Sequence, residues 1–389
     1  MFEIIANANL YSPEPEGLKH LLICAGKVVH IATDIPKLDP SLNVRHTDLE
    51  GAIVAPGFID GHAHLTGGGG EAGFATRVPP LPISQFTHTG VTTAIGLLGT
   101  DDLTRTPQSL LAQVMSLREE GMSAWCYTGG YHIPVTTLTG SIRSDMVNLD
   151  PVIGVGELAI SDHRSSQPTL DEILRIASEV HVAGLMTGKA GIVHFHLGDG
   201  QRGMSLINQC LDQSEIPARV FNPTHITRNR PLFRQACDLT KRGCYVDITA
   251  GPGGGDGWST VEAVNVYLDN NCSMNQLTIS SDGGGCLPEF DKTGQLLSMD
   301  FGRSSSLGEA LIDLVNSGIK LERVLPLLTS NVSTLLRLKH KGKIAPGFDA
   351  DLIVLGDQLQ INSVMLGGNW HVERGVQTIR GFFEKEVIL

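Results

Sequence analysis

The sequence predicts an α/β fold, a (β/α)8 barrel with β-rich segments at both ends of the chain. Three observations carry this prediction. Strand-like apolar runs alternate with helix-like stretches through the middle of the chain. Short strands separated by turn residues fill the first part, up to about residue 55, and the C-terminal end. Polar residues recur at the C-terminal ends of the central strands, where barrel enzymes place their active sites.

The two ends of the chain have the sequence pattern of antiparallel strands. The stretch LLICAGKVVHIA, from Leu21 to Ala32, consists of two apolar runs around a small turn, which predicts a hairpin. Near the C-terminus, KIAPGFDADLIVL and VMLGGNWHVERGVQTIR have the same character of short strands with turns between them.

The middle of the chain contains eight strand-like runs: FIDGHAH, VTTAIGLLG, SAWCYTGGY, VIGVGELAI, GIVHFHLGD, RVFNPTHI, CYVDITAG and LTISSDG. Helical apolar spacing marks stretches between them: PQSLLAQVMSLREEG, LDEILRIASEVHVAGLM, RPLFRQACDLTKRG and STVEAVNVYLDN. A doubly wound open sheet is the alternative. It would need fewer units and a glycine-rich nucleotide turn after a strand, and the sequence contains no such turn.

Composition narrows the class of protein. The chain has 389 residues, of which 41% are hydrophobic, enough for one large domain and a smaller one. A net charge of −12 argues against nucleic acid or an anionic membrane as partner. Seven cysteines without a C-x-x-C pair, an N-terminus without a basic signal region and the lack of a long apolar run predict a cytoplasmic protein.

Polar residues fall at the ends of the predicted strands, which meet at one mouth of a barrel: His62, His64, Thr100, Tyr131, Glu157, His196, His225 and Asp282. The histidines and carboxylates among them form a candidate metal site. Four histidines and two carboxylates suit zinc or a similar divalent metal, and six ligands are too many for one tetrahedral ion. We therefore expect two metals that share Glu157 as a bridge. Asp282 is expected to be a terminal ligand that also accepts a proton from the bridging water.

The segment HFH leaves a choice between two histidines, because His194 and His196 face the same way on a strand. We prefer His196 as the ligand, since it is nearer the end of the strand. His194 is expected to be a buried, hydrogen-bonded core residue.

Several motifs resemble the amidohydrolase superfamily: PGFIDGHAHL, a later strand-end histidine, PTH, SSDG and the terminal GKIAPGFDADLIVL. GGGGEAG, GLLGTD, TGGYHIP, SDHRS, FHLGD, PTHITRN and PLLTS resemble the isoaspartyl dipeptidase (β-aspartyl peptidase) family over nearly the whole chain. The resemblance implies a small β-sandwich domain from residues 1–55 and 342–389, a barrel over 56–341, and a homo-oligomer.

The resemblance also implies an activity, the hydrolysis of the isopeptide bond of β-aspartyl dipeptides by a hydroxide that bridges two Zn2+ ions in each subunit. His62 and His64 would hold one metal, with Asp282 as the general base, and His196 and His225 the other. The implied substrate contacts are Gly69, Glu71, Thr100, Tyr131, Arg164, Arg228 and the position of Cys286. Among these, Glu71 would receive the α-ammonium, Tyr131 would donate to the oxyanion, and the two arginines would hold carboxylates.

The charges of the substrate match these residues. An isoaspartyl dipeptide carries one ammonium and two carboxylates, and the sequence offers the carboxylate of Glu71 and the guanidiniums of Arg164 and Arg228. Each arginine could instead form a surface salt bridge, and Tyr131 could be a core residue. Both arginines follow a predicted ligand strand within a few residues, which favours the functional interpretation.

The chain departs from the family pattern at two positions. The family usually has a carboxylated lysine as the bridge, where this chain has Glu157. Gly156 and one extra residue in this stretch predict a bulge that brings the shorter glutamate inward. The alternative bridge, Lys189, precedes its strand and would lie at the opposite end of the barrel. Cys286 replaces a usual serine and is a poorer hydrogen-bond donor.

Two other functions remain open on the sequence. One is a different amide hydrolase of the superfamily, such as a cyclic amidase or an N-acyl-amino-acid deacetylase. The charge match of Glu71 with two arginines argues against both, because neither substrate class combines a free ammonium with two carboxylates. The other is a catalytically silent barrel, which predicts lost ligands, although every predicted ligand position is filled.

Overall fold

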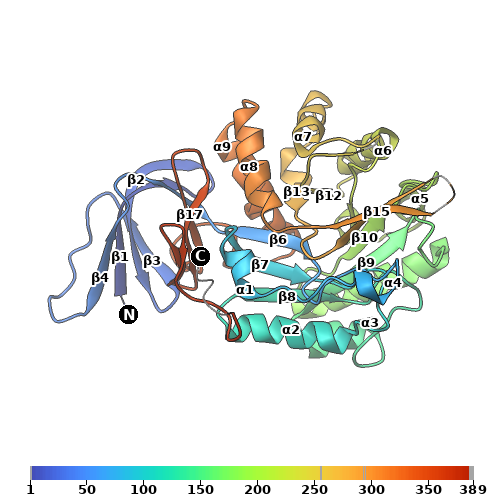
Figure 1. Cartoon of the computed structure of the whole chain (residues 1–389), viewed down its shortest axis with the longest axis horizontal. Coiled ribbons are helices and arrows are strands. Elements are labelled where there is room, and N and C mark those ends of the chain that lie inside the picture. The colour runs from blue at the N-terminus through green and yellow to red at the C-terminus, as the bar shows by residue number, and fades with distance from the viewer. Residues whose placement is uncertain (1, 255, 292, 294, 385–389) are drawn as a thin grey trace.

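The computed structural model describes residues 2–254, 256–291, 293 and 295–384. Figure 1 shows a β-rich part, built from the two ends of the chain, beside a barrel surrounded by helices. We keep residues 1–55 with 342–389, and 56–341, as the proposed division into domains; residues 385–389 lie outside the described part of the chain. Within that part, every helix is too short or too polar to span a membrane.

The barrel contains all eight predicted strands, and this prediction is confirmed. They are β6 (Phe58–Ala63), β7 (Val91–Gly96), β8 (Ser123–Thr128), β9 (Val152–Ile160), β10 (Val193–Leu197), β11 (Phe221–Thr224), β12 (Val246–Thr249) and β13 (Leu277–Ser280). Strands β6 to β11 form one parallel sheet in chain order, and β12 pairs with β13 in parallel. A bridge between Ala63 and Gly283 joins β6 to the end of β13, so the first and last strands meet.

Helices connect the strands and cover the barrel from outside (Figure 1). They are α1 (Ile83–Thr87), α2 (Pro107–Glu119), α3 (Ile142–Asn148), α4 (Leu170–Thr187), α5 (Ser205–Gln213), α6 (Arg230–Lys241), α7 (Thr260–Asp269), α8 (Ser306–Asn316), α9 (Leu321–Leu328) and α10 (Ser330–Leu335). Short 3-10 turns are η1 (Phe74–Thr76), η2 (Ala218–Val220) and η3 (Met274–Gln276). The four predicted helices are α2, α4, α6 and α7.

Local sequence explains where these four helices begin. The side chain of Thr106 accepts a hydrogen bond at the start of α2, and that of Asn229 does so at α6. Thr169 and Ser259 start α4 and α7 with capping boxes, in which a glutamate three residues later bonds back to the cap. Such caps satisfy backbone N–H groups that have no partner within the helix.

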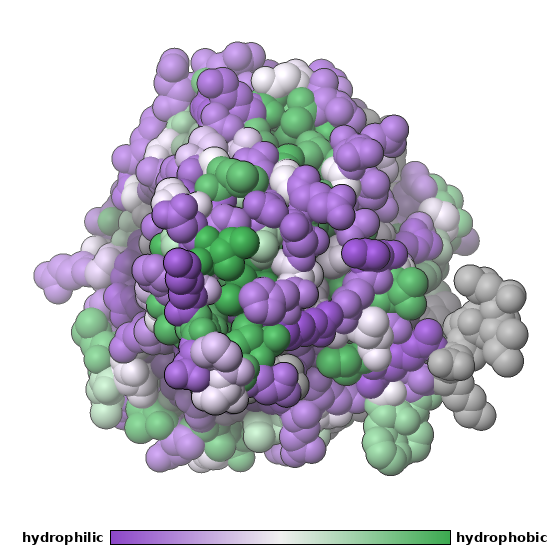
Figure 2. All heavy atoms as spheres, turned by 90° about the vertical axis from the view of Figure 1, so that its left-hand side faces the viewer, coloured by the Kyte–Doolittle hydropathy of each residue, from purple (hydrophilic) through white to green (hydrophobic). Residues whose placement is uncertain are grey.

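In the part of the chain that the structure describes, the small domain contains nine strands from both chain ends in one mixed sheet. Its strands are β1 (Phe2–Tyr11), β2 (Pro15–Cys24), β3 (Lys27–Ala32), β4 (Val44–Asp48), β5 (Ile53–Pro56), β16 (Leu352–Leu355), β17 (Ile361–Leu366), β18 (Asn369–Glu373) and β19 (Val376–Gln377). The predicted hairpin is confirmed, because β2 pairs antiparallel with β3. Figure 2 views this end of the molecule, where a hydrophobic patch is surrounded by hydrophilic residues.

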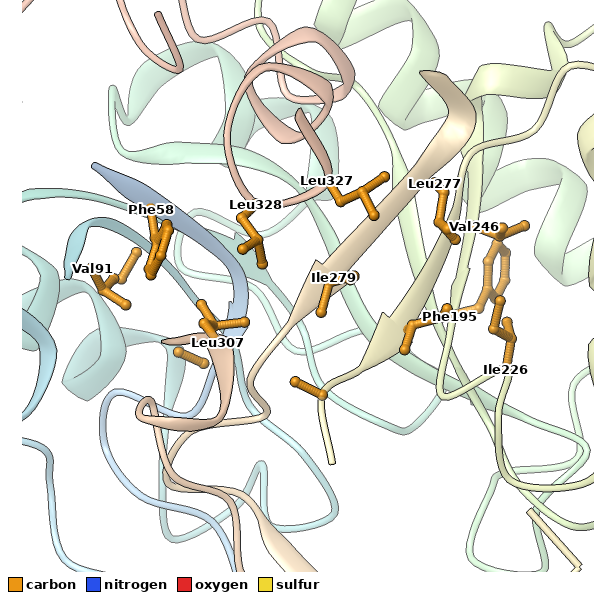
Figure 3. Close-up of a cluster of buried hydrophobic side chains, with 14 of the residues drawn as sticks. Phe58, Val91, Phe195, Ile226, Val246, Leu277, Ile279, Leu307, Leu327 and Leu328 are labelled. Atoms are coloured by element: carbon orange, nitrogen blue, oxygen red, sulfur yellow. The ribbon is translucent and has the colours of Figure 1, made fainter. Parts of the chain in front are cut away.

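The main hydrophobic core lies between the barrel strands and their helices. Figure 3 shows Phe58 and Val91 near Leu307 of α8, and Ile279 of β13 near Leu327 and Leu328 of α9. These side chains are buried. Because the strands are buried on both faces, most residues in them are apolar, and the strands could therefore be predicted from the sequence.

One hairpin was not predicted. Strands β14 (Cys286–Phe290) and β15 (Leu296–Phe301) form an antiparallel pair directly after β13. Its second strand is largely exposed and has no clear alternation of apolar residues. A bridge between Gly283 and Gly302 fixes its base at the mouth of the barrel, so Cys286 begins the hairpin beside the candidate site.

Candidate active site

Strand β6 brings His62 and His64 to the mouth of the barrel, with ring centroids 5.5 Å apart. Both side chains are buried. Asp60 anchors this strand, because its carboxylate accepts hydrogen bonds from the backbone N–H groups of His62 and Ser281. Burial raises the pKa of Asp60 to about 6. The carboxylate therefore joins the first barrel strand to the end of the last one.

Glu157 points into the barrel from a bulge in β9, as predicted. Val193 of β10 pairs with Val155, but Phe195 pairs with Leu158, so β9 has one extra residue at this point. Gly156 is required there, since a Cβ would lie 2.8 Å from the carbonyl oxygen of His194. Glu157 lies within the strand rather than at its end, and the bulge turns its short side chain toward the histidines.

The carboxylate of Glu157 touches histidines from three different strands. Oε2 lies 2.7 Å from His62 Nε2 and 3.4 Å from His225 Nε2. Oε1 lies 3.1 Å from His196 Nδ1. The two oxygens thus face different histidines, which is the arrangement expected of a bridging carboxylate.

Asp282 completes the group from the end of β13. Its Oδ1 atom lies 3.3 Å from His62 Nε2 and 3.2 Å from His64 Nε2. Asp282 and His225 have φ values of 53° and 58°, in the left-handed region that residues other than glycine seldom adopt. Strained backbone of this kind is often found at functional sites.

The electrostatics of these residues favour the binding of cations. Burial alone would lower the pKa of His62, but the neighbouring Glu157 and Asp282 outweigh it and raise that pKa well above its usual value. Burial would likewise raise the pKa of both carboxyls, yet the surrounding histidines lower it. Among the described residues, three buried atoms of the candidate metal ligands have no hydrogen-bond partner: His62 Nε2, His64 Nδ1 and Asp282 Oδ1.

Three overlapping groups place metal-ligand atoms within 4.8 Å of one another: His62, His225 and Asp282; His62, His64 and Glu157; and Glu157, His196 and His225. Nitrogen and carboxylate oxygen donors are those that zinc binds. Six side chains would hold two ions better than one. The residues present therefore fit a pair of divalent metals.

Other polar groups orient two of these histidines from behind. His196 turns Nε2 toward Asp162 Oδ2 at 2.9 Å, which leaves Nδ1 facing Glu157. His225 Nδ1 lies 2.6 Å from the hydroxyl of Thr249, which leaves Nε2 facing Glu157. Hydrogen bonds on the far nitrogen fix the orientation of a ligand histidine.

Tyr131 lies beside the metal-ligand cluster. Its hydroxyl is 2.8 Å from His196 Nδ1, and the guanidinium of Arg164 lies 5.5 Å from the centre of its ring. Burial and the nearby Glu157 raise the pKa of the Tyr131 hydroxyl well above its usual value. The hydroxyl therefore keeps its proton and is available as a donor.

A carboxylate and a guanidinium form the other wall of the cavity. Glu71 Oε1 accepts hydrogen bonds from Thr100 at 2.9 Å and from Arg164 at 3.4 Å. Cys286 Sγ lies 2.9 Å from Glu71 Oε2. Arg164 in turn donates two hydrogen bonds to the carboxylate of Asp162. Burial lowers the pKa of the Arg164 guanidinium, but neighbouring negative charge, including that of Asp162, outweighs burial and raises this pKa above its usual value.

All predicted site residues except His62 line one small cavity, and His62 lies completely buried beneath it. The cavity volume is only about 20 Å3. Arg228 lies at the edge, with its guanidinium 3.9 Å from Asp199. A substrate would therefore have to replace the contacts that Glu71 and Arg164 make with each other.

The sequence analysis missed Arg105, a buried arginine that holds the glycine loop before Glu71. Its guanidinium donates to the carbonyl oxygens of Thr66, Gly69 and Val78, and to the carboxylate of Asp101. The carbonyl partners of Arg105 are far from it in the sequence, and Asp101 is in the loop just before it, so no sequence motif marks Arg105 as a support of the site. The GLLGTD segment before it was the only signal nearby.

Two further predictions can be compared with the structure. His194 is buried and hydrogen-bonded to His62 and Asn222, which confirms its assignment as a core residue. Burial lowers the pKa of His194 to about 3. Lys189 donates to the carbonyl oxygens of Met146 and Leu149 and does not line the cavity, as expected of a residue before its strand.

A family model and several curated relatives match parts of the chain. Residues 259–371 match the amidohydrolase family. Adenine deaminase 2 of Carboxydothermus hydrogenoformans is 24% identical over 86% of this chain and 52% of its own length. Imidazolonepropionase of Salinispora arenicola is 33% identical over 36% of this chain and 35% of its own length. The chain thus spans about half the length, or less, of these relatives.

Solved structures give a fuller match. The chain resembles the β-aspartyl dipeptidase of Fervidobacterium islandicum AW-1 in complex with the β-Asp-Leu dipeptide, with a TM-score of 0.92, 42% identity, and coverage of 97% of this chain and 99% of that one. It also resembles a D-hydantoinase, with a TM-score of 0.67, 15% identity and 98% of each chain covered. The second likeness concerns the fold alone.

Proposed function

This chain belongs to the β-aspartyl dipeptidase family of the amidohydrolases, and on that premise we propose that it hydrolyses the isopeptide bond of β-aspartyl dipeptides with two divalent metals, most simply zinc. One observation carries the choice of substrate. The carboxylate of Glu71 and the guanidinium of Arg164 face each other beside the cluster of histidines and acids. An isoaspartyl dipeptide offers an ammonium to the one and a carboxylate to the other.

In this proposal two metals would share Glu157. His62, His64 and Asp282 would hold one of them, and His196 and His225 would hold the other. When bound, such ions polarise the amide carbonyl and lower the pKa of the attacking water. Asp282 accepts the proton of that water and returns it to the leaving amine. Carbon–nitrogen cleavage then yields aspartate and the second amino acid.

Tyr131 is proposed to donate its hydroxyl hydrogen to the carbonyl oxygen as negative charge develops there. It is suited to this role because its proton is retained and its hydroxyl is 2.8 Å from His196. Thr100 and the backbone around Gly69 support the aspartyl end of the substrate. Arg164 and Arg228 hold the two carboxylates, through the paired donors of each guanidinium.

A panel of four dipeptides tests this function: β-Asp-Leu, α-Asp-Leu, γ-Glu-Leu and N-acetyl-β-Asp-Leu. We expect rapid hydrolysis of the first and little of the others, because they misplace the scissile bond or lack the ammonium. Glu71→Gln should lose most of the rate, since the substrate ammonium is then poorly paired. Glu119→Gln, on an exposed position of α2, is the matched control. Preference for the α-linked or acetylated peptide would refute the proposal.

A further inference from the structure

A chain of buried hydrogen bonds runs behind His62, on the side away from the carboxylates. His62 Nδ1 lies 2.9 Å from His194 Nε2, and His194 Nδ1 lies 2.7 Å from Asn222 Oδ1. The amide nitrogen of Asn222 donates to the carbonyl oxygen of Tyr245 at 3.1 Å. The side chains of His62, His194 and Asn222 are almost completely buried. The proposed mechanism uses neither His194 nor Asn222.

The carbonyl group of Tyr245, at the far end of this series of hydrogen bonds, determines which group donates and which accepts in each bond. The carbonyl oxygen of Tyr245 can only accept, so the Asn222 atom beside it is the NH2 group. The Asn222 atom that faces His194 is then the carbonyl oxygen, which also can only accept. His194 must therefore carry its hydrogen on Nδ1. A neutral imidazole has one donor and one acceptor, so His194 Nε2 accepts from His62 Nδ1.

We propose that His194 is a positioning residue that fixes the tautomer of His62. Because His62 Nδ1 keeps its hydrogen for His194, the nitrogen that can give up a proton and offer a lone pair to a metal is Nε2. That nitrogen is the one beside Glu157 Oε2, at 2.7 Å, and Asp282 Oδ1, at 3.3 Å. Of the two ring nitrogens of His62, Nε2 is thus the one directed toward a metal.

Packing holds the ring of His194 in the plane that this role requires. The ring of Tyr127 stacks on it, with centroids 5.3 Å apart and an angle of 26° between the planes. Gly156 lets β9 approach closely, because a Cβ there would meet His194 Cβ at 2.9 Å. The bulge that turns Glu157 inward therefore rests against the residue that orients His62. This arrangement also gives a reason for two histidines in HFH, one a proposed ligand and the other its support.

The first test measures zinc affinity of the apoprotein by competition with a chelator. His194→Phe keeps a planar ring but removes both hydrogen bonds, and it should weaken zinc binding about 10- to 100-fold. His194→Gln offers an amide oxygen to His62 and an NH2 group to Asn222, and it should recover most of the affinity. Asn222→Leu removes the end of the chain without changing His194, and it should cause a smaller loss.

His371→Phe is the matched control, because His371 is equally buried but lies on β18 of the small domain. It should leave zinc affinity unchanged, whatever its effect on the melting temperature. A folded His194→Phe protein that binds zinc as tightly as the wild type would overturn the proposal. So would a set of variants in which the melting temperature falls and zinc affinity does not.

The second test reads the tautomers directly in the wild-type protein and uses variants only to assign peaks. In the zinc-loaded protein with 15N-labelled histidine, long-range 1H–15N correlation spectra distinguish protonated from unprotonated ring nitrogens. We expect His194 and His62 each to carry hydrogen on Nδ1, with peaks assigned by loss in His194→Gln and His62→Gln. Hydrogen on Nε2 of His194 would reverse the chain of bonds and refute the proposal.

The inference rests on the metal site of the proposed function but not on its substrate. If the wild-type protein fails to hydrolyse β-Asp-Leu while the zinc affinities and tautomers are as expected, the substrate assignment falls and the role of His194 stands. If the dipeptide is hydrolysed and the tautomers are reversed, the role of His194 falls alone.

Discussion

The thiol of Cys286 lies 2.9 Å from Oε2 of Glu71, so the first residue of the β14–β15 hairpin touches the carboxylate proposed to bind the substrate ammonium. Burial and the negative charge of Glu71 raise the pKa of this thiol well above its usual value. Cys286 therefore acts as a neutral hydrogen-bond donor to Glu71. It occupies the position where the family usually has a serine.

Cys286→Ser is expected to keep or slightly lower the KM for β-Asp-Leu, because a hydroxyl is a better donor to Glu71 than a thiol. Cys286→Ala should raise KM, since Glu71 loses one of its partners. Steady-state kinetics check both. Iodoacetamide at pH 8 should inactivate the wild-type enzyme only slowly, because the thiolate is the reactive form. An alanine variant with unchanged KM would contradict this role for Cys286.

Tyr131→Phe is expected to lower kcat by about a hundredfold or more, as loss of an oxyanion donor does in other enzymes. The phenylalanine keeps the ring packing and removes only the hydroxyl, which lies 2.8 Å from His196 Nδ1. Zinc content should stay near that of the wild type, and this is measured alongside the rate. If the variant turns over as fast as the wild type, Tyr131 has no part in catalysis.

Zinc reconstitution is expected to be indifferent to bicarbonate, because Glu157 carries its two oxygens permanently. A carboxylated lysine would need carbon dioxide, and Lys189 is held away from the cavity by the carbonyl oxygens of Met146 and Leu149. Apoprotein reloaded with zinc in degassed buffer should regain full activity. Glu157→Ala should lose both the second metal and turnover. A bicarbonate requirement would rule out Glu157 as the bridge.

Arg105→Lys is expected to lower kcat/KM by about tenfold to a hundredfold, because one ammonium cannot replace a guanidinium that serves three carbonyl oxygens and a carboxylate. The loop before Glu71 would then be less well placed. Most of the effect should be on KM. Arg77→Lys, an exposed neighbour in the same region, is the control and should behave as the wild type.

Lys341→Met is expected to lower the free energy of unfolding by about 3–5 kcal/mol, because it leaves a buried aspartate without its partner. Lys341 contacts both Asp349 and Asp351, and its side chain is 6% exposed. Denaturant unfolding measures the change, with exposed Lys320→Met as the control.

The ion pair between Lys341 and Asp349 also predicts a pH dependence of stability. Burial raises the pKa of Asp349, but the charge of Lys341 outweighs it and holds the folded-state pKa below its usual value. Stability from this pair should thus be complete above about pH 4 and fall as pH drops further.

The sequence by itself determined the eight barrel strands and the set of candidate ligands. A strand buried on both faces needs an apolar run, and that requirement is visible in each run from FIDGHAH to LTISSDG. The ends of parallel strands meet at one mouth, so residues as far apart as His62 and Asp282 could be placed together. The bulge before Glu157 could also be predicted, because a glycine and an extra residue mark it locally.

Only the tertiary structure decided how the site residues are supported. Arg105 holds backbone carbonyl oxygens, and a carbonyl oxygen has no sequence signature. Asp162 and Asn222 act through distances between neighbouring strands, which a one-dimensional pattern does not contain. The exposed β14–β15 hairpin lacks the apolar period that reveals a buried strand. Burial imposes a pattern on the residues that are buried, whereas a hydrogen bond between distant segments imposes none until the chain is folded.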